Sequence, residues 1–138
     1  GPGALDMYHV VVGVDDNEPR ALACARAIVD LPGAAAETTA TLVHSFTDRA
    51  DGDAAAEVDS VRAAVDVLAD VGIDAAVVGT TGDPAERILE VATDEDADLL
   101  VLAGRKRSPA GKALFGSVSQ SVVLGTDRPV MVVGDATG

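Results

Sequence analysis

Short apolar runs rich in β-branched residues alternate along this chain with amphipathic stretches, and this alternation restricts the fold more than any other feature. A run such as YHVVVGV at 8–14 is apolar almost throughout, which is the pattern of a strand covered on both faces. We expect strands at 8–14, 38–45, 73–78, 97–103 and 130–133, and helices at 18–31, 54–71, 84–93 and 117–124. Such alternation predicts an α/β three-layer sandwich, with a five-stranded parallel sheet and helices on both faces.

Length and composition suit one domain with a single core, since the chain has 138 residues and 48% of them are hydrophobic. Residues 1–6 precede Met7 and are interpreted as the remnant of an expression tag, so the domain is expected at 7–138. The longest apolar runs fall far short of the roughly 20 residues of a membrane-spanning helix, and we expect no membrane association. The lone Cys24 cannot form an internal disulfide, so it is interpreted as a buried helix residue in a cytoplasmic protein.

The charge balance is strongly acidic, with 23 Asp and Glu against 10 Lys and Arg and a formal net charge of −13. Charge of this sign repels nucleic acids and anionic membranes, so neither is expected as a partner. One interpretation is a surface adapted to high salt, in a protein of halophilic origin, because at 1 M salt the Debye length is about 3 Å. An acidic surface that binds a partner is the alternative.

The segment that follows the run at 97–103 concentrates the cations of this acidic chain. Four of the ten Lys and Arg residues lie within it: Arg105, Lys106, Arg107 and Lys112. Gly104 and Gly116 allow close backbone approach, and Ser117 and Ser119 open a predicted helix, whose first N–H groups favour an anion. The segment therefore predicts a phosphate-binding loop, although four crowded cations also suit a solvated surface patch.

Asp15 ends the first predicted strand, as Gly104 ends the fourth. In doubly wound sheets, ligands bind beyond the carboxyl ends of the strands where the strand order reverses. If the first strand is central with the fourth beside it, Asp15 and Gly104 line that crevice. A helix N-cap is the alternative role for Asp15, and for Ser117 and Ser119 at the last helix.

Other function classes find less support in the residues. There is no apparent Ser, His and carboxylate set and no metal-ligand cluster, and His44 and His9 are interpreted as packed, neutral residues on strands. A receiver domain needs an Asp after the third strand and a Lys after the fifth, and neither is present at 78–81 or 133–135. A dinucleotide site needs a glycine-rich turn where this chain has DDNEP at 15–19. An enzymatic role is not expected, and slow ATP hydrolysis stays open.

Several separated motifs together resemble the universal stress protein family over 7–134. They are Val14-Asp15, LVHSF at 42–46, Gly82-Asp83-Pro84, the loop from Gly104, Gly116-Ser117-Val118 and Arg128-Pro129-Val130. The resemblance implies a sheet order of 3-2-1-4-5 and a role in stress response or signalling. It also implies a homodimer through the last strand, which is made of Val130, Met131, Val132 and Val133.

One branch of that family binds ATP, with Mg²⁺, through a loop of the pattern G-x2-G-x9-G-[ST]. Carried over to this chain, the branch implies that Asp15 lies near the adenine or ribose and that the backbone near Ser45 borders the base. It also implies phosphate contacts from Gly104, Gly116, Ser117 and Ser119. The crowding of cations, rather than the resemblance, adds Arg105 and Arg107 as candidate anion contacts, and Val118 is a further candidate beside Ser117.

The loop departs from that pattern at Arg107, which stands where the second glycine belongs, and it is one residue shorter. The Arg107 side chain either blocks the close backbone approach or binds phosphate itself through a bidentate contact. Two functions therefore stay open, a module that binds ATP or another phosphate-bearing ligand and a dimeric scaffold without nucleotide.

Overall fold

The computed structural model describes residues 7–46, 58–104 and 116–134, and within them all strand pairs are parallel, in the order β3-β2-β1-β4-β5. The strands are β1 (Tyr8–Gly13), β2 (Thr38–Phe46), β3 (Asp74–Thr81), β4 (Leu99–Ala103) and β5 (Val130–Val133). The helices are α1 (Glu18–Val29), α2 (Ala34–Glu37), α3 (Asp59–Asp70), α4 (Pro84–Asp94) and α5 (Ser117–Gly125). The predicted α/β fold and the sheet order 3-2-1-4-5 are confirmed.

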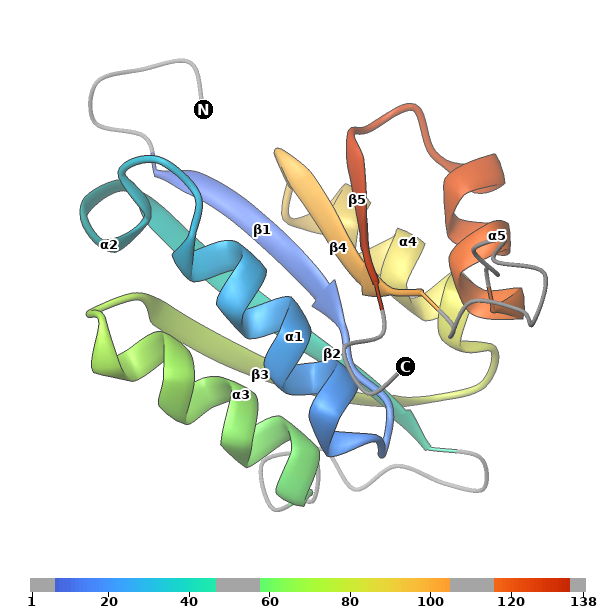
Figure 1. The fold of residues 1–138 in the computed structure, drawn as a ribbon. Helices are drawn as coiled ribbons and strands as arrows, with labels where there is room; N and C mark the ends of the chain where they lie inside the picture. The colour runs from blue at the N-terminus through green and yellow to red at the C-terminus, as the bar shows by residue number, and fades with distance from the viewer. Residues whose placement is uncertain (1–6, 47–57, 105–115, 135–138) are drawn as a thin grey trace, which may run out of the picture.

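Helices cover both faces of the sheet, with α1 and α3 on one face and α4 and α5 on the other (Figure 1). Successive residues of β1 face alternate layers. Val10 and Val12 pack in the core beneath α1 and α3, whereas Val11 packs in the core beneath α4 and α5. All three are at most 2% exposed, which explains why the run is apolar without interruption. Within the described ranges, no helix is long and apolar enough to cross a bilayer.

Two helices begin at the carboxyl edge of the sheet with side-chain caps. The Asn17 side chain accepts a hydrogen bond from the Arg20 backbone N–H (2.9 Å) at the start of α1. The Asp83 side chain accepts one from the Glu86 N–H (3.0 Å) at the start of α4. The N-cap of α1 is therefore Asn17, and the alternative that assigned this role to Asp15 is wrong. Each cap fixes the entry of a helix beside the site described below.

The bounds differ from the predicted ones chiefly around β3. The segment 79–83, between the strand predicted at 73–78 and the helix predicted at 84–93, was expected to be a turn, yet Gly79–Thr81 pair with His44–Phe46 of β2 and extend the strand. The turn is therefore shorter than expected and contains Gly82, whose φ of 104° suits glycine. The single-turn helix α2 was not expected. Residues 54–57 of the predicted second helix lie outside the described residues, as does the expected tag remnant at 1–6.

Candidate functional site

The strand order reverses at β1, which pairs with β2 on one side and with β4 on the other. The chain leaves both β1 and β4 at the same edge of the sheet, because the two strands are parallel. Asp15 follows β1, Gly104 follows β4, and both residues line one hollow at this edge. The predicted meeting of these two residues at the switch point is confirmed.

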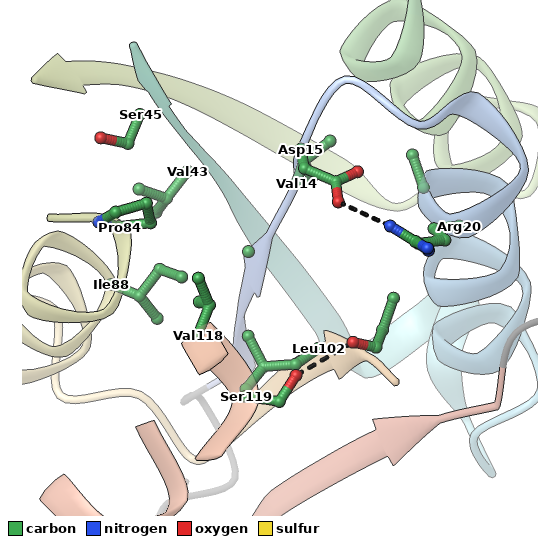
Figure 2. Close-up of a pocket in the computed structure, with 13 residues that line it drawn as sticks. Val14, Asp15, Arg20, Val43, Ser45, Pro84, Ile88, Leu102, Val118 and Ser119 are labelled. Carbon is green, nitrogen blue, oxygen red and sulfur yellow. Dashed lines mark hydrogen bonds and ion pairs between the residues drawn. The ribbon is translucent and has the colours of Figure 1, made fainter. Parts of the chain in front are cut away.

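The larger of two hollows at this edge has a volume of about 130 Å³ and mostly apolar walls (Figure 2). It is lined by Gly13, Val14, Asp15, Arg20, Ala21, Val43, Ser45, Pro84, Ile88, Leu102, Ala103, Val118 and Ser119. A Cβ atom at Gly13 would lie 2.6 Å from Ile88 Cδ1 and 2.9 Å from Leu102 Cδ2. Glycine at this position therefore lets α4 and β4 approach β1 closely.

A smaller hollow of about 80 Å³ adjoins the first and is more polar. It is lined by Asp15, Arg20, Ala103, Gly104, Gly116, Ser117, Val118 and Ser119, five of which also line the larger hollow. Helix α5 begins here with Gly116 as N-cap and no side-chain cap. The first-turn N–H groups of a helix have no acceptor within the helix, so this end of α5 offers donors to an anion.

Asp15 has a fixed backbone and an exposed carboxylate. Its carbonyl oxygen accepts a hydrogen bond from the buried Ser60 hydroxyl at 2.6 Å, which ties the β1–α1 turn to α3. Its carboxylate accepts the Asn17 N–H at 2.9 Å and lies 3.4 Å from Arg20 Nη1 (Figure 2). The Asp15 side chain is 58% exposed, so it remains accessible to a ligand in either hollow.

His44 secures the same turn from the β2 side. Its Nδ1 lies 2.9 Å from the Val14 carbonyl oxygen, and since a carbonyl only accepts, Nδ1 carries the hydrogen. Nε2 lies 3.5 Å from an Asp16 carboxylate oxygen, and the ring packs edge-on against Phe46 with centroids 4.7 Å apart. The residue is 4% exposed, which confirms the interpretation of His44 as a packed histidine.

His9 differs from His44 because it lies in a polar cluster at the amino end of the sheet. Its Nδ1 is 2.7 Å from Thr39 Oγ1, and its Nε2 is 2.7 Å from Glu95 Oε1. Thr41 donates to the same Glu95 oxygen at 2.6 Å. The expectation of apolar packing is therefore wrong for His9, and this cluster lies away from both hollows.

The structure brings together most of the residues named from the sequence. The larger or smaller hollow is lined by Asp15, Ser45, Gly104, Gly116, Ser117, Val118 and Ser119. The remaining four candidates, all cations of the loop, lie outside the described residues: Arg105, Lys106, Arg107 and Lys112.

Several of these side chains and amides already donate hydrogen bonds to backbone carbonyl oxygens. The Ser45 hydroxyl donates to the Gly82 carbonyl at 2.8 Å, and the buried Ser119 hydroxyl donates to the Ala103 carbonyl at 3.0 Å. The Gly104 N–H donates to the Val133 carbonyl at 2.7 Å. Because neither Ser117 nor Ser119 caps α5, that alternative for the two serines is wrong. Ser117 is exposed at the rim of the smaller hollow.

Sequence reasoning missed the apolar walls and one cation. Ile88 lies in the helix predicted at 84–93 and Leu102 in the strand predicted at 97–103, and their place in the hollow depends on the packing of α4 against the sheet. Arg20 lines both hollows, and within the described ranges it is the only Lys or Arg that does so. The sequence feature that could have identified Arg20 is its position in the first turn of the helix after the first strand, where the helix dipole disfavours positive charge.

The described part of the chain contains no group of three or more His, Cys, Asp or Glu side chains that could hold a metal ion. What this part of the chain does present is an apolar hollow, a polar hollow and the start of a helix at one crevice. These features define a doubly wound α/β protein with two adjoining hollows at its switch point. A model of the universal stress protein family matches residues 7–134, and the chain therefore belongs to that family.

Segments of the chain are similar to curated relatives. A universal stress protein of Methanocaldococcus jannaschii is 32% identical over 66 residues, which are 48% of this chain and 41% of that protein. A universal stress protein of Mycolicibacterium smegmatis is 43% identical over 51 residues, 37% of this chain and 39% of that protein. The matched segments therefore span about two fifths of the length of each of these relatives.

Solved structures are similar over nearly the whole chain. The universal stress protein of Archaeoglobus fulgidus has a TM-score of 0.70 and 28% identity, with 94% of this chain and 99% of that chain covered. A universal stress protein in complex with cAMP has a TM-score of 0.69 and 24% identity, with coverage of 95% and 99%. A family member from Arabidopsis thaliana with AMP bound has a TM-score of 0.68 and 17% identity, with coverage of 91% and 90%.

Proposed function

We propose that this protein binds a nucleotide, such as ATP, in the crevice beyond β1 and β4 and serves a stress-response or signalling role. The observation that carries the proposal is the junction of the two hollows. An apolar hollow and a polar one adjoin at Asp15, and the α5 N-terminus borders the polar one. A nucleotide has the same division, with an apolar base at one end and anionic phosphates at the other.

The wall residues fit each part of such a ligand. Ile88 and Val118 supply apolar surface for a base, and the exposed Asp15 carboxylate supplies an acceptor for a ribose hydroxyl. Ser117 and the first-turn N–H groups of α5 supply donors for phosphate. The cAMP and AMP held by the two related structures support a nucleotide as the ligand class. Mg²⁺ would enter with ATP, held by the phosphates.

Mass spectrometry of ligand released from the purified protein, followed by calorimetry with ATP and Mg²⁺ and with AMP, tests the proposal. Val118→Phe would fill the junction of the hollows and should weaken binding at least tenfold. Val123→Phe places the same side chain on the exposed part of α5 and should leave binding unchanged. Absence of binding at millimolar nucleotide would contradict the proposal and favour a scaffold without nucleotide.

We further propose that the protein forms a homodimer through β5. Among the residues that the structure describes, this strand pairs only with β4, so its other edge has no neighbour there. All four of its residues are partly exposed although all four are apolar: Val130, Met131, Val132 and Val133. An apolar edge strand of this kind suits pairing with a second copy across a two-fold axis.

A further inference from the structure

Arg20 occupies a fixed position between the two hollows. It lies in the first turn of α1, where its backbone N–H donates to the Asn17 side chain at 2.9 Å. Its side chain is 21% exposed and lies beside Asp15, across the larger hollow from Pro84 and Ile88 (Figure 2). The cap therefore fixes the backbone of Arg20, and the guanidinium borders both the apolar and the polar hollow.

This position is unfavourable for a cation in terms of helix stability alone. The N-terminus of a helix carries partial positive charge, so a cation in its first turn is electrostatically unfavourable. An anion beside Arg20 offsets that cost. Asp15 supplies one carboxylate, but its hydrogen bond to Arg20 is long, at 3.4 Å, and the carboxylate is 58% exposed. Such exposed pairs contribute little to stability, so a phosphate can compete with the Asp15 carboxylate for this guanidinium.

The carboxylates around the crevice repel a phosphate, so phosphate binding there requires a cation. Asp15 lines both hollows and Asp16 follows it, within a chain whose net charge is −13. A phosphate that enters the smaller hollow meets the Asp15 carboxylate on the same wall as Arg20. Without the guanidinium, the repulsion between phosphate and carboxylate would be opposed, among the groups described, only by the uncharged donors of α5, which are its first-turn N–H groups and the Ser117 hydroxyl.

We propose that Arg20 binds the phosphate group of the nucleotide and thereby determines preference for nucleotides over nucleosides. On ligand entry, the guanidinium exchanges its single long hydrogen bond to Asp15 for bidentate hydrogen bonds to phosphate oxygens, a geometry that the planar guanidinium favours. Asp15 is then available to accept a hydrogen bond from the ribose. This inference rests on the proposed nucleotide function, and it adds a phosphate contact from α1, on the opposite wall from α5.

Calorimetric titration with AMP and with adenosine, which differ only by the phosphate, tests the proposal on the full chain. The wild type should bind AMP more tightly than adenosine. Arg20→Gln should weaken AMP binding about 10- to 100-fold, the range expected for loss of a hydrogen bond between charged groups. Adenosine binding should change less than twofold. Arg20→Lys should restore part of the AMP affinity, because it returns the charge without the planar fork.

Arg26→Gln is the matched control, because it removes the same charge from the exposed last turn of the same helix and should leave both affinities unchanged. Equal loss of AMP affinity in Arg26→Gln and Arg20→Gln would show a general charge effect and overturn the inference. So would an Arg20→Gln variant that binds AMP as the wild type does, while the proposed function would stand. A wild type that binds neither AMP, adenosine nor ATP with Mg²⁺ would overturn both.

Discussion

Cys24 lies on the face of α1 that packs against the sheet and is 1% exposed. Burial, together with the negative charge of Asp15 as the second cause, raises the pKa of its thiol from 9.0 to about 12. The thiol therefore stays protonated in the folded protein at every physiological pH, and the residue acts as a small apolar side chain, as the sequence predicted.

This raised pKa predicts an alkaline loss of stability that a Cys24→Ala variant lacks. Below pH 9 the thiol is protonated in both states and contributes no pH dependence. Between pH 9 and about 12 only the unfolded state loses the proton, so the free energy of unfolding should fall by about 1.4 kcal/mol per pH unit. Urea denaturation of both proteins from pH 8 to 11 measures the difference, and parallel curves would contradict the assignment.

Ser60 is a positioning residue for the ligand site, because its hydroxyl donates at 2.6 Å to the carbonyl of Asp15. Ser60→Ala leaves that carbonyl without this donor and should lower the free energy of unfolding by about 1 kcal/mol. It should also weaken nucleotide binding, since the Asp15 turn is then held less firmly. Ser121→Ala, on the exposed face of α5, is the control for both measurements. Unchanged urea midpoints in Ser60→Ala would show that the bond contributes nothing.

Helices and strands could be assigned from the sequence wherever their pattern of burial is simple. The runs at β1 and β4 are buried from both sides, so their apolar character is continuous and their assignment unambiguous. β5 was predicted with its observed bounds because Pro129 precedes it and Gly134 follows. The meeting of Asp15 and Gly104 also followed from the sequence, since parallel strands end at a common edge.

The remaining features depend on contacts between distant segments. β3 continues through Thr81 because β2 offers partners up to Phe46, and no local propensity encodes that pairing. The apolar hollow exists because Gly13 lets Ile88 of α4 and Leu102 of β4 approach β1, a relation among three segments. Arg20 does not stand out by charge density, because the cations of this chain are concentrated at 105–112, and only its position at the start of α1 distinguishes it.

The proposed dimer predicts a difference between the two edge strands. Val132→Lys places a charge in the apolar edge of β5 and should convert the homodimer to a monomer at micromolar concentration. Ala76→Lys places the same charge on an exposed position of β3, the opposite edge, and should leave assembly unchanged. Light scattering coupled to size-exclusion chromatography gives the masses. A wild type that is monomeric at micromolar concentration would refute the dimer.

For the whole molecule, the net charge of −13 predicts a strong dependence of stability on salt. Repulsion among carboxylates destabilises the compact state, and at 1 M salt the Debye length of about 3 Å screens most of it. We expect the melting temperature to rise by about 5 °C or more between 0.1 and 2 M KCl, corresponding to about 1 kcal/mol or more. A protein adapted to high salt would behave in this way.

A variant of α3 tests whether charge repulsion causes the dependence of stability on salt. Asp66 and Asp70 are exposed on this helix, and replacing both with Asn removes two negative charges without touching the core. The variant should show a smaller rise of melting temperature with KCl than the wild type. A wild-type melting temperature that is independent of KCl, or identical slopes for the two proteins, would contradict the repulsion account.

The hydrogen bond from the Gly104 N–H to the Val133 carbonyl joins the rim of the smaller hollow to the last residue of β5. In the proposed dimer, this bond would transmit a ligand-induced shift of Gly104 to the end of the edge strand, and a shift of β5 on pairing back to Gly104. By thermodynamic reciprocity, each event changes the free energy of the other by the same amount. Nucleotide affinity should consequently vary with protein concentration across the dimerisation range, so that the protein would report its own abundance together with that of its ligand.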